Sequence, residues 1–463
     1  MKFDKNFVWG CATSSYQIEG AHNEDGKGPS IWDAFCSIPG KIKNNQNGNI
    51  ANDHYHRFKE DVKILKEMGV DAYRFSISWS RILPDGKNKV NEKGIEFYNN
   101  LIDELIKNGI KPWVTLYHWD LPLALQMEHS GWLSRDTIKH FVHYAETCFK
   151  YFGDRVDNWI TFNEPWVVAI LGHGAGVFAP GRVSKSEPYL VAHHLILAHA
   201  ETVKMYRENY QREESVIGIS NNCDWREPLT DKIEDIESAQ RSLEFFLGWF
   251  ADPIYLGDYP KVMKKRLGER LPEFTLEEKK LIKGSSDFFG LNHYTTMYAS
   301  HDAAVDGQNV YGNGGISEDQ DVALSINPAW KLSDMKWAVA PWGLRKLLNW
   351  IKERYDNPNV YITENGYADK DSVINGEIDD QDRLEYHSGY IEACGESILD
   401  GVNLKGYFAW SFMDNFEWAE GYSKRFGLYY VDFEVLDRVP KSSAKWYSAF
   451  IKKTKDELIA LTY

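Results

Sequence analysis

The sequence predicts an α/β protein in which eight parallel strands alternate with helices and close into a (β/α)8 barrel. Three observations favour this fold class. Eight short runs carry β-forming residues, the stretches between them carry apolar residues at helical spacing, and no linker rich in Gly, Ser or Pro divides the 463 residues. A doubly wound open sheet uses the same elements and stays the structural alternative. We therefore expect one domain over residues 1–463.

The expected strands are short runs of residues that favour extended backbone. Helical stretches separate them, and this alternation is typical of a parallel sheet. The strands are expected over residues 7–13, 72–77, 111–116, 158–162, 216–220, 287–291, 359–363 and 405–409.

Three of the intervening stretches show helical spacing most clearly. Apolar residues recur at that spacing over 58–68, 95–106 and 138–152, and Gly69, Gly109 and Gly153 follow them. A glycine just past the last apolar position is the expected end of a helix. Between the sixth and seventh strands, residues 301–321 are polar and glycine-rich. This insertion is expected to be either a disordered surface loop or the rim of a pocket.

The charge of the chain limits its partners. With 53 basic and 68 acidic side chains the net charge is −15, so the surface repels polyphosphate. We therefore expect neither nucleic acid nor an anionic membrane as a partner, and the oligomeric state stays open. The 17 Trp, 26 Tyr and 23 Phe residues suit either a large core or the apolar faces of sugars.

The cysteines and the N-terminal residues indicate the compartment. The five cysteines are odd in number and form no CxxC pair, which argues against a disulfide framework or a structural zinc site. Residues 1–10 contain no apolar segment of a secretory leader, and no apolar run is long enough to span a membrane. We therefore expect a cytoplasmic protein.

Polar and aromatic residues gather at the ends of six expected strands, where a barrel of this kind carries its catalytic groups. Single polar residues there are usually helix caps, but six clusters on one face are hard to explain as caps. These clusters contain Arg74, His118, Trp119, Asn163, Glu164, Asn292, Tyr294, Glu364, Trp410, Glu417 and Trp418.

Glu164 and Glu364 are the pair that indicates a reaction. Both follow directly on a β-run, and each has an Asn beside it. Taken singly, either one is explained as a helix cap or a salt-bridge partner. Two carboxyl groups that face each other across a pocket are the equipment for cleaving a glycosidic bond, one protonated and one ionised. Together with the aromatic excess, the pair favours a glycosidase.

The sequence closely resembles the family-1 glycoside hydrolases, the β-glucosidases and β-galactosidases, along nearly its whole length. The resemblance runs from FVWGCATSSYQIEG at residues 7–20 to RFGLYYVD at residues 425–432, with NEP at 163–165 and TENG at 363–366. It implies a TIM barrel, hydrolysis that retains the anomeric configuration, and a small-molecule β-glycoside as substrate. It implies no cofactor and no metal.

The resemblance also assigns roles to residues. Glu164 matches the general acid/base and Glu364 the nucleophile, with Arg74 and Tyr294 at the positions that contact the nucleophile. The remaining matches are substrate-binding positions, namely Gln17, His118, Trp119, Asn163, Asn292, Tyr294, Trp337, Trp410, Glu417, Trp418 and Phe426. The chain departs from the family pattern at Lys336, where Gly is usual, and at Trp342, where an acidic residue is common.

Other activities on the same scaffold leave different signatures. The 6-phosphoglycosidases of the family carry Ser in place of Glu417, with a downstream Lys and Tyr, whereas this chain has Lys424 and Phe426. A thioglucosidase would carry Gln in place of Glu164, and a catalytically silent sugar-binding protein would lack one of the two carboxyl groups. The histidines at 54, 56, 193 and 194 lack a third ligand at metal-binding spacing. We therefore expect a retaining enzyme that removes terminal β-linked glucose, and also galactose or fucose, from oligosaccharides and aryl glycosides.

Overall fold

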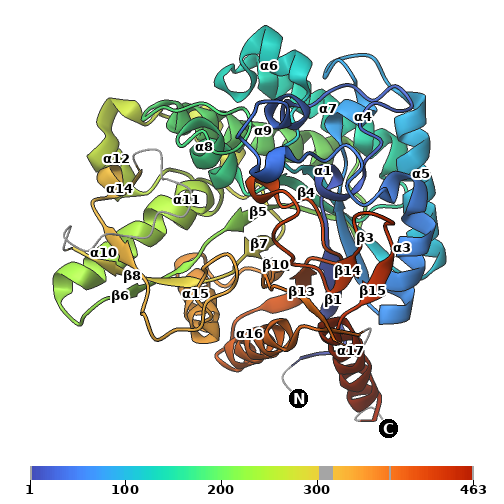
Figure 1. Ribbon diagram of the computed structural model, residues 1–463. Coiled ribbons are helices and arrows are strands. Elements are labelled where there is room, and N and C mark those ends of the chain that lie inside the picture. The colour runs from blue at the N-terminus through green and yellow to red at the C-terminus, as the bar shows by residue number, and fades with distance from the viewer. Residues whose placement is uncertain (1–2, 302–315, 375–376, 461–463) are drawn as a thin grey trace.

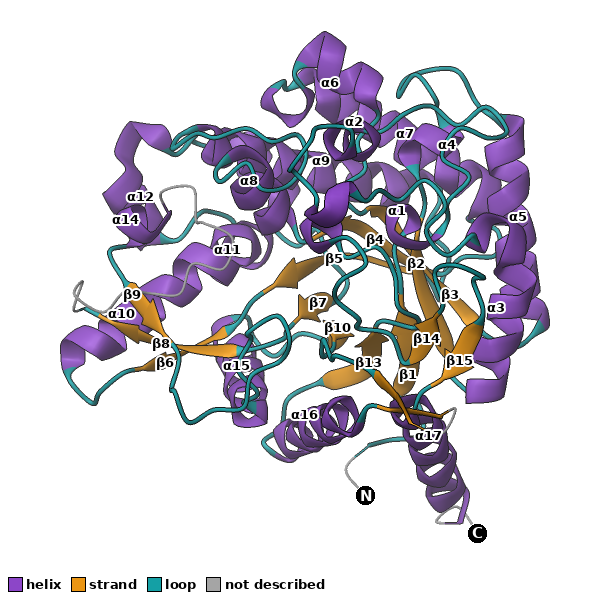
Figure 2. Cartoon of the chain, viewed as in Figure 1, coloured by secondary structure: helices purple, strands orange, loops and turns teal. Residues whose placement is uncertain are grey.

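The computed structural model describes residues 3–301, 316–374 and 377–460. Its centre is a closed barrel of parallel strands surrounded by helices (Figures 1 and 2). Around the barrel the strands are ordered β1-β13-β10-β7-β5-β4-β3-β2, and β1 pairs with both β13 and β2 to close the ring. The predicted (β/α)8 barrel is confirmed, and the open-sheet alternative is wrong.

All eight strands lie where the sequence predicts them, with ends that differ by a few residues. The barrel strands are β1 (Val8–Ala12), β2 (Ala72–Ser76), β3 (Lys111–Tyr117), β4 (Asn158–Asn163), β5 (Val216–Asn222), β7 (Phe289–Asn292), β10 (Val360–Asn365) and β13 (Leu404–Trp410).

The outer layer consists of long helices that cover the strands (Figure 2). These helices include α3 (His54–Met68), α5 (Glu92–Lys107), α7 (Asp136–Phe152), α9 (Glu187–Asn209), α15 (Pro341–Arg354), α16 (Gln381–Leu399) and α17 (Ser442–Ala460), and the shorter α11 (Trp249–Leu256). The glycine rule predicts the ends of α3, α5 and α7 within two residues. Gly69 and Gly109 are left-handed, with φ of 75° and 73°, whereas Gly153 keeps a right-handed φ of −67°.

Shorter helices lie mainly in the loops. They are α1 (Ser15–Ile18), α2 (Ile31–Cys36), α4 (Trp79–Ile82), α6 (Leu123–His129), α8 (Pro165–His173), α10 (Ile233–Leu243), α12 (Lys261–Leu267), α13 (Leu276–Ile282) and α14 (Ile316–Gln320). A π-helical turn, Glu244–Gly248, joins α10 to α11. No helix among the described residues has the length and apolar content to cross a membrane.

Three small sheets lie outside the barrel and were not predicted. They are β6 (Trp225–Pro228) with β8 (Thr296–Ser300) and β9 (Ala323–Ser325), β11 (Ser372–Ile374) with β12 (Glu377–Asp379), and β14 (Tyr429–Val431) with β15 (Arg438–Pro440). Figure 2 shows the β6-β8-β9 sheet to one side of the barrel. Most of the polar insertion, residues 302–315, lies outside the described residues.

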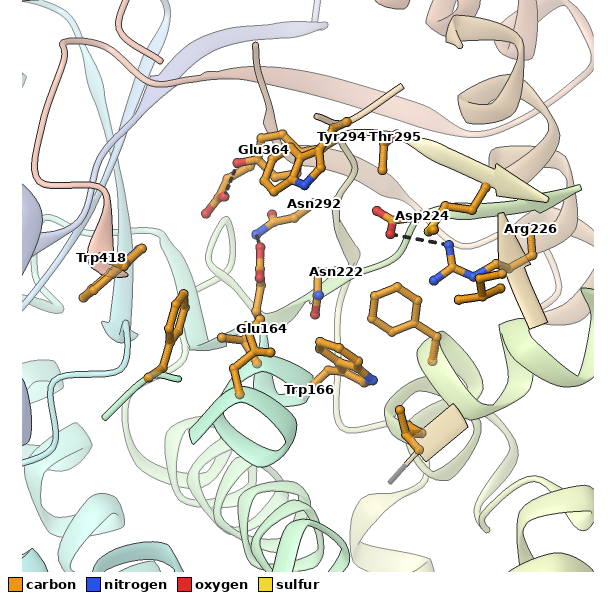
Figure 3. A pocket seen from close by; sticks show the side chains of 18 of the residues that line it. Glu164, Trp166, Asn222, Asp224, Arg226, Asn292, Tyr294, Thr295, Glu364 and Trp418 are labelled. Atoms are coloured by element: carbon orange, nitrogen blue, oxygen red, sulfur yellow. Dashed lines mark hydrogen bonds and ion pairs between the residues drawn. The ribbon is translucent and has the colours of Figure 1, made fainter. Parts of the chain in front are cut away.

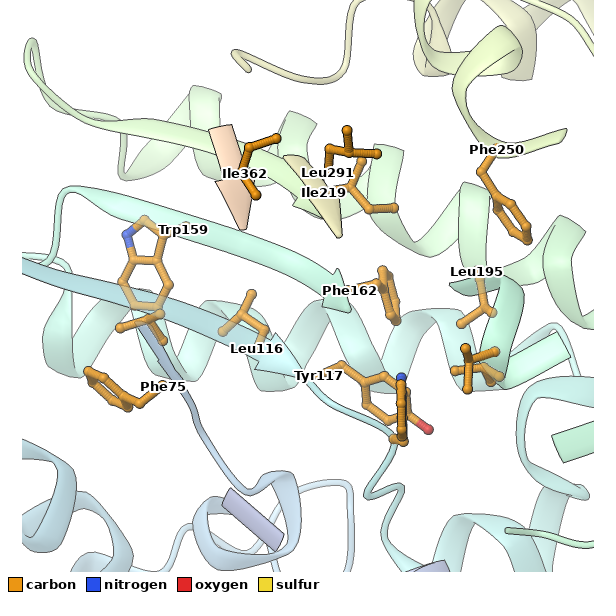
Figure 4. Close-up of a cluster of buried hydrophobic side chains, with 14 of the residues drawn as sticks. Phe75, Leu116, Tyr117, Trp159, Phe162, Leu195, Ile219, Phe250, Leu291 and Ile362 are labelled. Atoms are coloured by element: carbon orange, nitrogen blue, oxygen red, sulfur yellow. The ribbon is translucent and has the colours of Figure 1, made fainter. Parts of the chain in front are cut away.

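Apolar side chains fill both the barrel interior and the layer between strands and helices. Figure 4 shows part of the second layer, where Phe75, Trp159 and Ile219 of the strands belong to the same buried cluster as Leu195 of α9. Inside the barrel, Trp113 packs on Tyr361 and Phe408 with ring centroids 4.7 and 5.1 Å apart. This aromatic cluster fills the barrel interior, and the polar residues of the strand ends lie beyond it in the C-terminal direction.

Candidate active site

A cavity of about 240 Å³ opens at the carboxyl ends of the barrel strands. Both predicted glutamates line it, and Figure 3 shows their side chains pointing into the same space. Of the residues predicted from the sequence, those that line the cavity are His118, Trp119, Glu164, Asn292, Tyr294, Trp337, Glu364, Trp410, Glu417, Trp418 and Phe426. Gln17, Arg74 and Asn163 lie behind this lining and are fully buried.

Glu364 is held by two donors from neighbouring strands. It is the second-last residue of β10, so its side chain emerges at the open end of the barrel. The guanidinium Nη1 of Arg74 donates to its Oε1 at 2.7 Å, and the hydroxyl of Tyr294 donates to its Oε2 at 2.6 Å. Both carboxylate oxygens are therefore hydrogen-bonded, which fixes the orientation of the group and favours its charged form.

Glu164 has neutral surroundings. It follows β4 in a left-handed conformation with φ of 47°, and its backbone N–H donates to the carbonyl of Ser220 at 2.8 Å. Its side chain does not cap the helix that begins at Pro165, so the helix-cap explanation does not apply. The amide Nδ2 of Asn292 donates to its Oε1 at 2.6 Å. No cation contacts this carboxyl group directly among the described residues.

The two carboxyl groups titrate as a pair. Burial raises the pKa of Glu164 well above its usual range, and the nearby charge of Glu364 raises it further. Burial also raises the pKa of Glu364, but the charge of Arg74 and the hydroxyl of Tyr294 oppose that rise. The first proton that the pair binds therefore resides on Glu164, while Glu364 stays ionised.

A buried hydrogen-bond network connects the pair to the strands below. Arg74 Nη2 donates to Asn163 Oδ1 at 2.6 Å, and Asn292 Nδ2 donates to the same oxygen at 3.0 Å. Asn163 Nδ2 donates to His118 Nε2 at 3.0 Å, so the imidazole carries its proton on Nδ1. Burial and the charge of Arg74 hold the pKa of His118 well below its usual range, which keeps it neutral.

Two of the cavity-lining residues predicted from the sequence carry a buried polar atom that has no hydrogen-bond partner in the described part of the chain. His118 Nδ1 and Glu417 Oε2 are buried without a hydrogen bond, although both residues line the cavity. Burial and the charge of Glu364 raise the pKa of Glu417 to about 8. Unpaired buried polar atoms are costly, so this donor and this acceptor point to a ligand that supplies hydroxyl groups.

Gln17 does not reach the cavity surface. Its Nε2 donates to Asn415 Oδ1 at 3.1 Å and to the carbonyl of Phe416 at 2.9 Å, and its Oε1 accepts from Ser14 at 2.6 Å. The side chain is thus used to hold the segment that carries Glu417. The neighbouring Trp119 and Trp418 contact each other at 4.6 Å between ring centroids and form an aromatic wall.

The cavity extends farther than the sequence predicted. The cavity continues past the glutamates on the side away from Trp418 (Figure 3). Residues at the end of β5, in the segment that follows it and in several other elements line this part. These residues include Trp166, Asn222, Asp224, Arg226, Ser242, Phe245, Phe246, Met297, Ile316, Gln320, Leu324 and Ile326. In the sequence, the polar residues that follow the fifth expected strand could have revealed this part of the cavity. Because Ile316 and Gln320 belong to the polar insertion, the described end of that insertion forms part of the pocket rim.

The departures from the family pattern lie off the cavity surface. Lys336 is exposed and adopts φ of 64°, a left-handed conformation that favours glycine. Trp342 is 38% exposed and packs edge-on against Trp330. Lys424, which a phosphate site would use, instead pairs with Asp334 at 2.7 Å.

The isolated histidines have structural partners. His54 Nδ1 contacts Asp61 at 2.7 Å, and His194 Nδ1 contacts the carbonyl of Trp132 at 2.8 Å. The described residues contain no group of three or more His, Cys, Asp or Glu that could hold a metal ion. All five cysteines are buried with free thiols.

Comparison with known sequences identifies the family. Residues 1–456 match the family described as "Glycosyl hydrolase family 1". β-Glucosidase 42 of Arabidopsis thaliana is 49% identical, over 97% of this chain and 94% of its own length. β-Glucosidase 6 of Oryza sativa subsp. japonica is 48% identical, over 97% of this chain and 90% of its own.

Solved structures agree with this match. A rice β-glucosidase superposes with a TM-score of 0.92 at 46% identity, over 97% of this chain and 98% of that one. A family 1 β-glucosidase from Thermotoga maritima superposes with a TM-score of 0.91 at 45% identity, again over 97% and 98% of the two chains. The chain shares its barrel with these relatives and carries a pair of buried glutamates at the open end. It therefore belongs to glycosyl hydrolase family 1 and is a glycoside hydrolase.

Proposed function

We propose that the protein is a β-glucosidase that hydrolyses its substrate in two displacement steps and retains the anomeric configuration. In the first step Glu364 attacks the anomeric carbon while Glu164 gives its proton to the leaving oxygen. In the second step Glu164, now a base, takes a proton from the water that releases the sugar from Glu364. The observation that carries this proposal is the contrast between the two carboxyl groups.

The contrast suits each glutamate to its step. Arg74 and Tyr294 orient Glu364 and favour its charge, as a nucleophile requires. Among the described residues the side chain of Glu164 is hydrogen-bonded only to the neutral amide of Asn292, and its raised pKa keeps the proton that an acid must donate. When the charge of Glu364 is consumed by the covalent bond, the pKa of Glu164 falls and the group can act as a base.

Two structures of relatives support the same chemistry. A variant of the rice β-glucosidase is described in a covalent complex with glucose. The Thermotoga maritima enzyme is described in complex with glucoimidazole and with galacto-hydroximolactam. By this analogy we infer that the present enzyme forms a covalent glucosyl intermediate and accepts both glucose and galactose configurations.

The surroundings of Glu417 favour a neutral sugar. Its Oε2 is buried and has no partner among the described residues, so it suits a sugar hydroxyl, whereas a phosphate would meet a carboxyl group at this position in place of a cation. Lys424 is engaged by Asp334 and does not line the cavity. We therefore favour unphosphorylated glucosides from short oligosaccharides and aryl glycosides over 6-phosphoglucosides.

A panel of aryl β-glycosides tests the proposal. We expect turnover of the aryl β-glucoside and β-galactoside, little turnover of the 6-phosphoglucoside, and the β-anomer as the first product seen by NMR. First release of the α-anomer would contradict the two-step mechanism. Selective cleavage of the 6-phosphoglucoside would contradict the assigned substrate class.

The variant Glu364→Gly isolates the nucleophile. We expect it to lose hydrolysis of β-glucosides by at least about 10⁴-fold, because no covalent intermediate can form. It should still couple α-glucosyl fluoride to a sugar or aryl glucoside acceptor, since Glu164 remains as the base. Product analysis by mass spectrometry measures the coupling. Residual hydrolysis at the wild-type rate would exclude Glu364 as the nucleophile.

A further inference from the structure

The side of the cavity opposite the aromatic wall of Trp119 and Trp418 contains an unassigned pair of charged residues. Asp224 and Arg226 line the cavity, and Figure 3 shows them beyond Asn222, away from Trp418. If the terminal sugar lies against Trp418 with its anomeric carbon between the glutamates, this side receives the leaving group. The segment containing the pair crosses from β5 of the barrel to β6 of the small sheet.

The small sheet directs Arg226 inward. Side chains alternate along β6, so Arg226 points to the cavity while Trp225 and Glu227 point the other way. Glu227 indeed pairs with Lys346 at 2.7 Å on the outer side, whereas Arg226 is only 6% exposed. Its guanidinium lies over the ring of Phe246 at 5.1 Å, so the group is fixed in place on an aromatic face.

The hydrogen-bonding capacity of Arg226 is only partly used. Nε donates to Ser242 Oγ at 3.2 Å, and Nη1 donates to Asp224 Oδ2 at 3.4 Å. Within the described part of the chain, Nη2 makes no hydrogen bond. A guanidinium with unused N–H groups in a buried site is costly unless a ligand or water accepts from it.

Acceptors beside Arg226 are also unused. Asn222 Oδ1 is buried and has no partner in the described structure. Asp224 receives one long contact from Arg226 and leaves its other oxygen available to the cavity. A structural ion pair would be expected to use both of its partners more fully, for example in a two-bond contact. Two acceptors, on Asn222 and Asp224, and the donors of Arg226 therefore lie on the same part of the cavity wall.

This arrangement selects among leaving groups. An aryl or alkyl group would bury the unpaired atoms of Asn222 and Arg226 without replacing their hydrogen bonds. A carboxylate on the leaving group would meet Arg226 but be opposed by Asp224. A sugar ring offers hydroxyl donors and acceptors at its edge and an apolar face for the nearby rings of Trp166 and Phe246.

We propose that Asp224 and Arg226 form a subsite that recognises a hydroxylated leaving group, namely a second sugar ring, and so determine the preference for disaccharides over aryl glucosides. Arg226 Nη2 donates to a hydroxyl oxygen of that ring, and Asp224 accepts from a neighbouring hydroxyl. The inference rests on the proposed β-glucosidase function and adds residues that select the leaving group.

The test is a ratio of specificity constants. For the wild type, Arg226→Met and Asp224→Asn, kcat/KM is measured with cellobiose and with 4-nitrophenyl β-glucoside. We expect each variant to lose about 10- to 100-fold on cellobiose and less than about 3-fold on the aryl glucoside, because only the sugar fills the lost hydrogen bonds. The matched control Arg155→Met removes a surface guanidinium that pairs with Asp103 and should leave both constants unchanged.

A second measurement covers variants that are poorly folded. With the aryl glucoside as donor, the glucosyl enzyme partitions between water and added cellobiose as acceptor. Because an acceptor sugar occupies the same subsite, Arg226→Met should lower the ratio of transfer to hydrolysis about 10-fold. This ratio does not depend on how much enzyme is active. Arg226→Lys, which keeps a donor, should recover part of it.

The outcomes separate the two proposals. If the wild type cleaves neither substrate, the proposed function is wrong. If the wild type cleaves both substrates and each variant loses the same factor in kcat/KM on both, Asp224 and Arg226 support the fold or the chemistry. The inference is then overturned. It is also overturned if Arg226→Met chiefly impairs 4-carboxyphenyl β-glucoside, since the subsite would then recognise an acid.

Discussion

At the scale of the residue, two identical side chains acquire opposite tasks from their neighbours. Glu164 and Glu364 are both buried at strand ends, yet only Glu364 contacts a cation and a phenol. Desolvation acts on both carboxyl groups in the same direction, so it cannot distinguish them. The difference comes from Arg74, which lies 290 residues away along the sequence but next to Glu364 in space.

Glu164→Gln tests the acid role. The amide keeps the hydrogen bond geometry but cannot protonate the leaving oxygen. We expect kcat/KM to fall about 10²- to 10⁴-fold for glucosides with poor leaving groups and far less for dinitrophenyl glucoside, whose leaving group needs no proton. The measurement is the slope of log kcat/KM against leaving-group pKa. An equal loss across the series would argue against proton donation by Glu164.

Arg74→Met tests the charge that supports Glu364. The charge of Arg74 opposes the rise that burial causes in the pKa of Glu364. Without the guanidinium, this pKa should therefore be higher still. Since the ionised form is required, the acidic limb of the kcat/KM profile should move to higher pH by one unit or more. Arg74→Lys keeps a charge and should move it less. An unshifted acidic limb in Arg74→Met would contradict the assigned role of the ion pair.

The sequence predicted most of the site because its residues follow strands directly. Glu164 and Glu364 were found in this way, and eleven of the predicted residues do line the cavity. Asp224 and Arg226 were missed because they lie in the connection after β5 and reach the cavity only through the small sheet. The position of Gln17 behind the lining depends on its contacts with Asn415 and Phe416, which are 398 and 399 residues away along the chain.

At the scale of the element, long amphipathic helices and barrel strands were predictable, whereas short edge strands were not. The helix α5 repeats its apolar positions over several turns and ends near Gly109, so local pattern alone identifies it. The strand β9 has only three half-buried residues, and it forms because β8 offers a partner in antiparallel register. Pairing between distant segments leaves little trace in local composition.

Gly366→Ala tests how closely β10 and β13 approach at the site. A β-carbon at Gly366 would overlap the carbonyl oxygen of Trp410, which is backbone and cannot move aside easily. We expect a loss of about 1–3 kcal/mol in the free energy of unfolding and a fall of about 100-fold in kcat, because Glu364 is only two residues away. Thermal unfolding and steady-state kinetics measure the two effects.

Gly389→Ala is the matched control for this substitution. Gly389 lies inside α16, where the nearest atom to a new β-carbon is a side-chain atom of Pro341 at 3.1 Å. Alanine also favours the helix, so stability should change by less than about 1 kcal/mol and kcat should stay the same. Normal activity and stability of Gly366→Ala would show that the strand ends tolerate separation.

At the scale of the whole molecule, contacts between the two ends of the chain close the barrel. The first strand, β1, pairs with the last, β13, in parallel register. The final helix, α17, adds a hydrogen bond from the hydroxyl of Tyr447 to the carbonyl of Gly10 at 3.0 Å. Figure 1 accordingly shows the described ends of the chain on the same side of the barrel. The free energy of these contacts must offset the entropy of closing a loop that spans nearly the whole chain.

A buried ion network is part of this closure. Lys441, just before α17, contacts Asp371 and pairs with Asp414 at 2.7 Å, and the side chains of all three are fully buried. Asp414 also accepts from the backbone N–H of Gly427 at 2.9 Å, which holds the segment after β13 that carries Glu417. One lysine therefore joins the C-terminal helix to the cavity wall.

Lys441→Met tests this connection. The substitution leaves two buried carboxylates with one cation fewer, and we expect the free energy of unfolding to fall by about 3–5 kcal/mol, as measured by urea denaturation. Adding Asp371→Asn should restore part of the loss, because it removes one of the two buried carboxylate charges that have lost their lysine partner. The control Lys445→Met breaks an exposed pair with Glu377 and should cost less than about 1 kcal/mol. A loss in Lys441→Met no larger than that of the control would show that the network does not help to hold the closed barrel together.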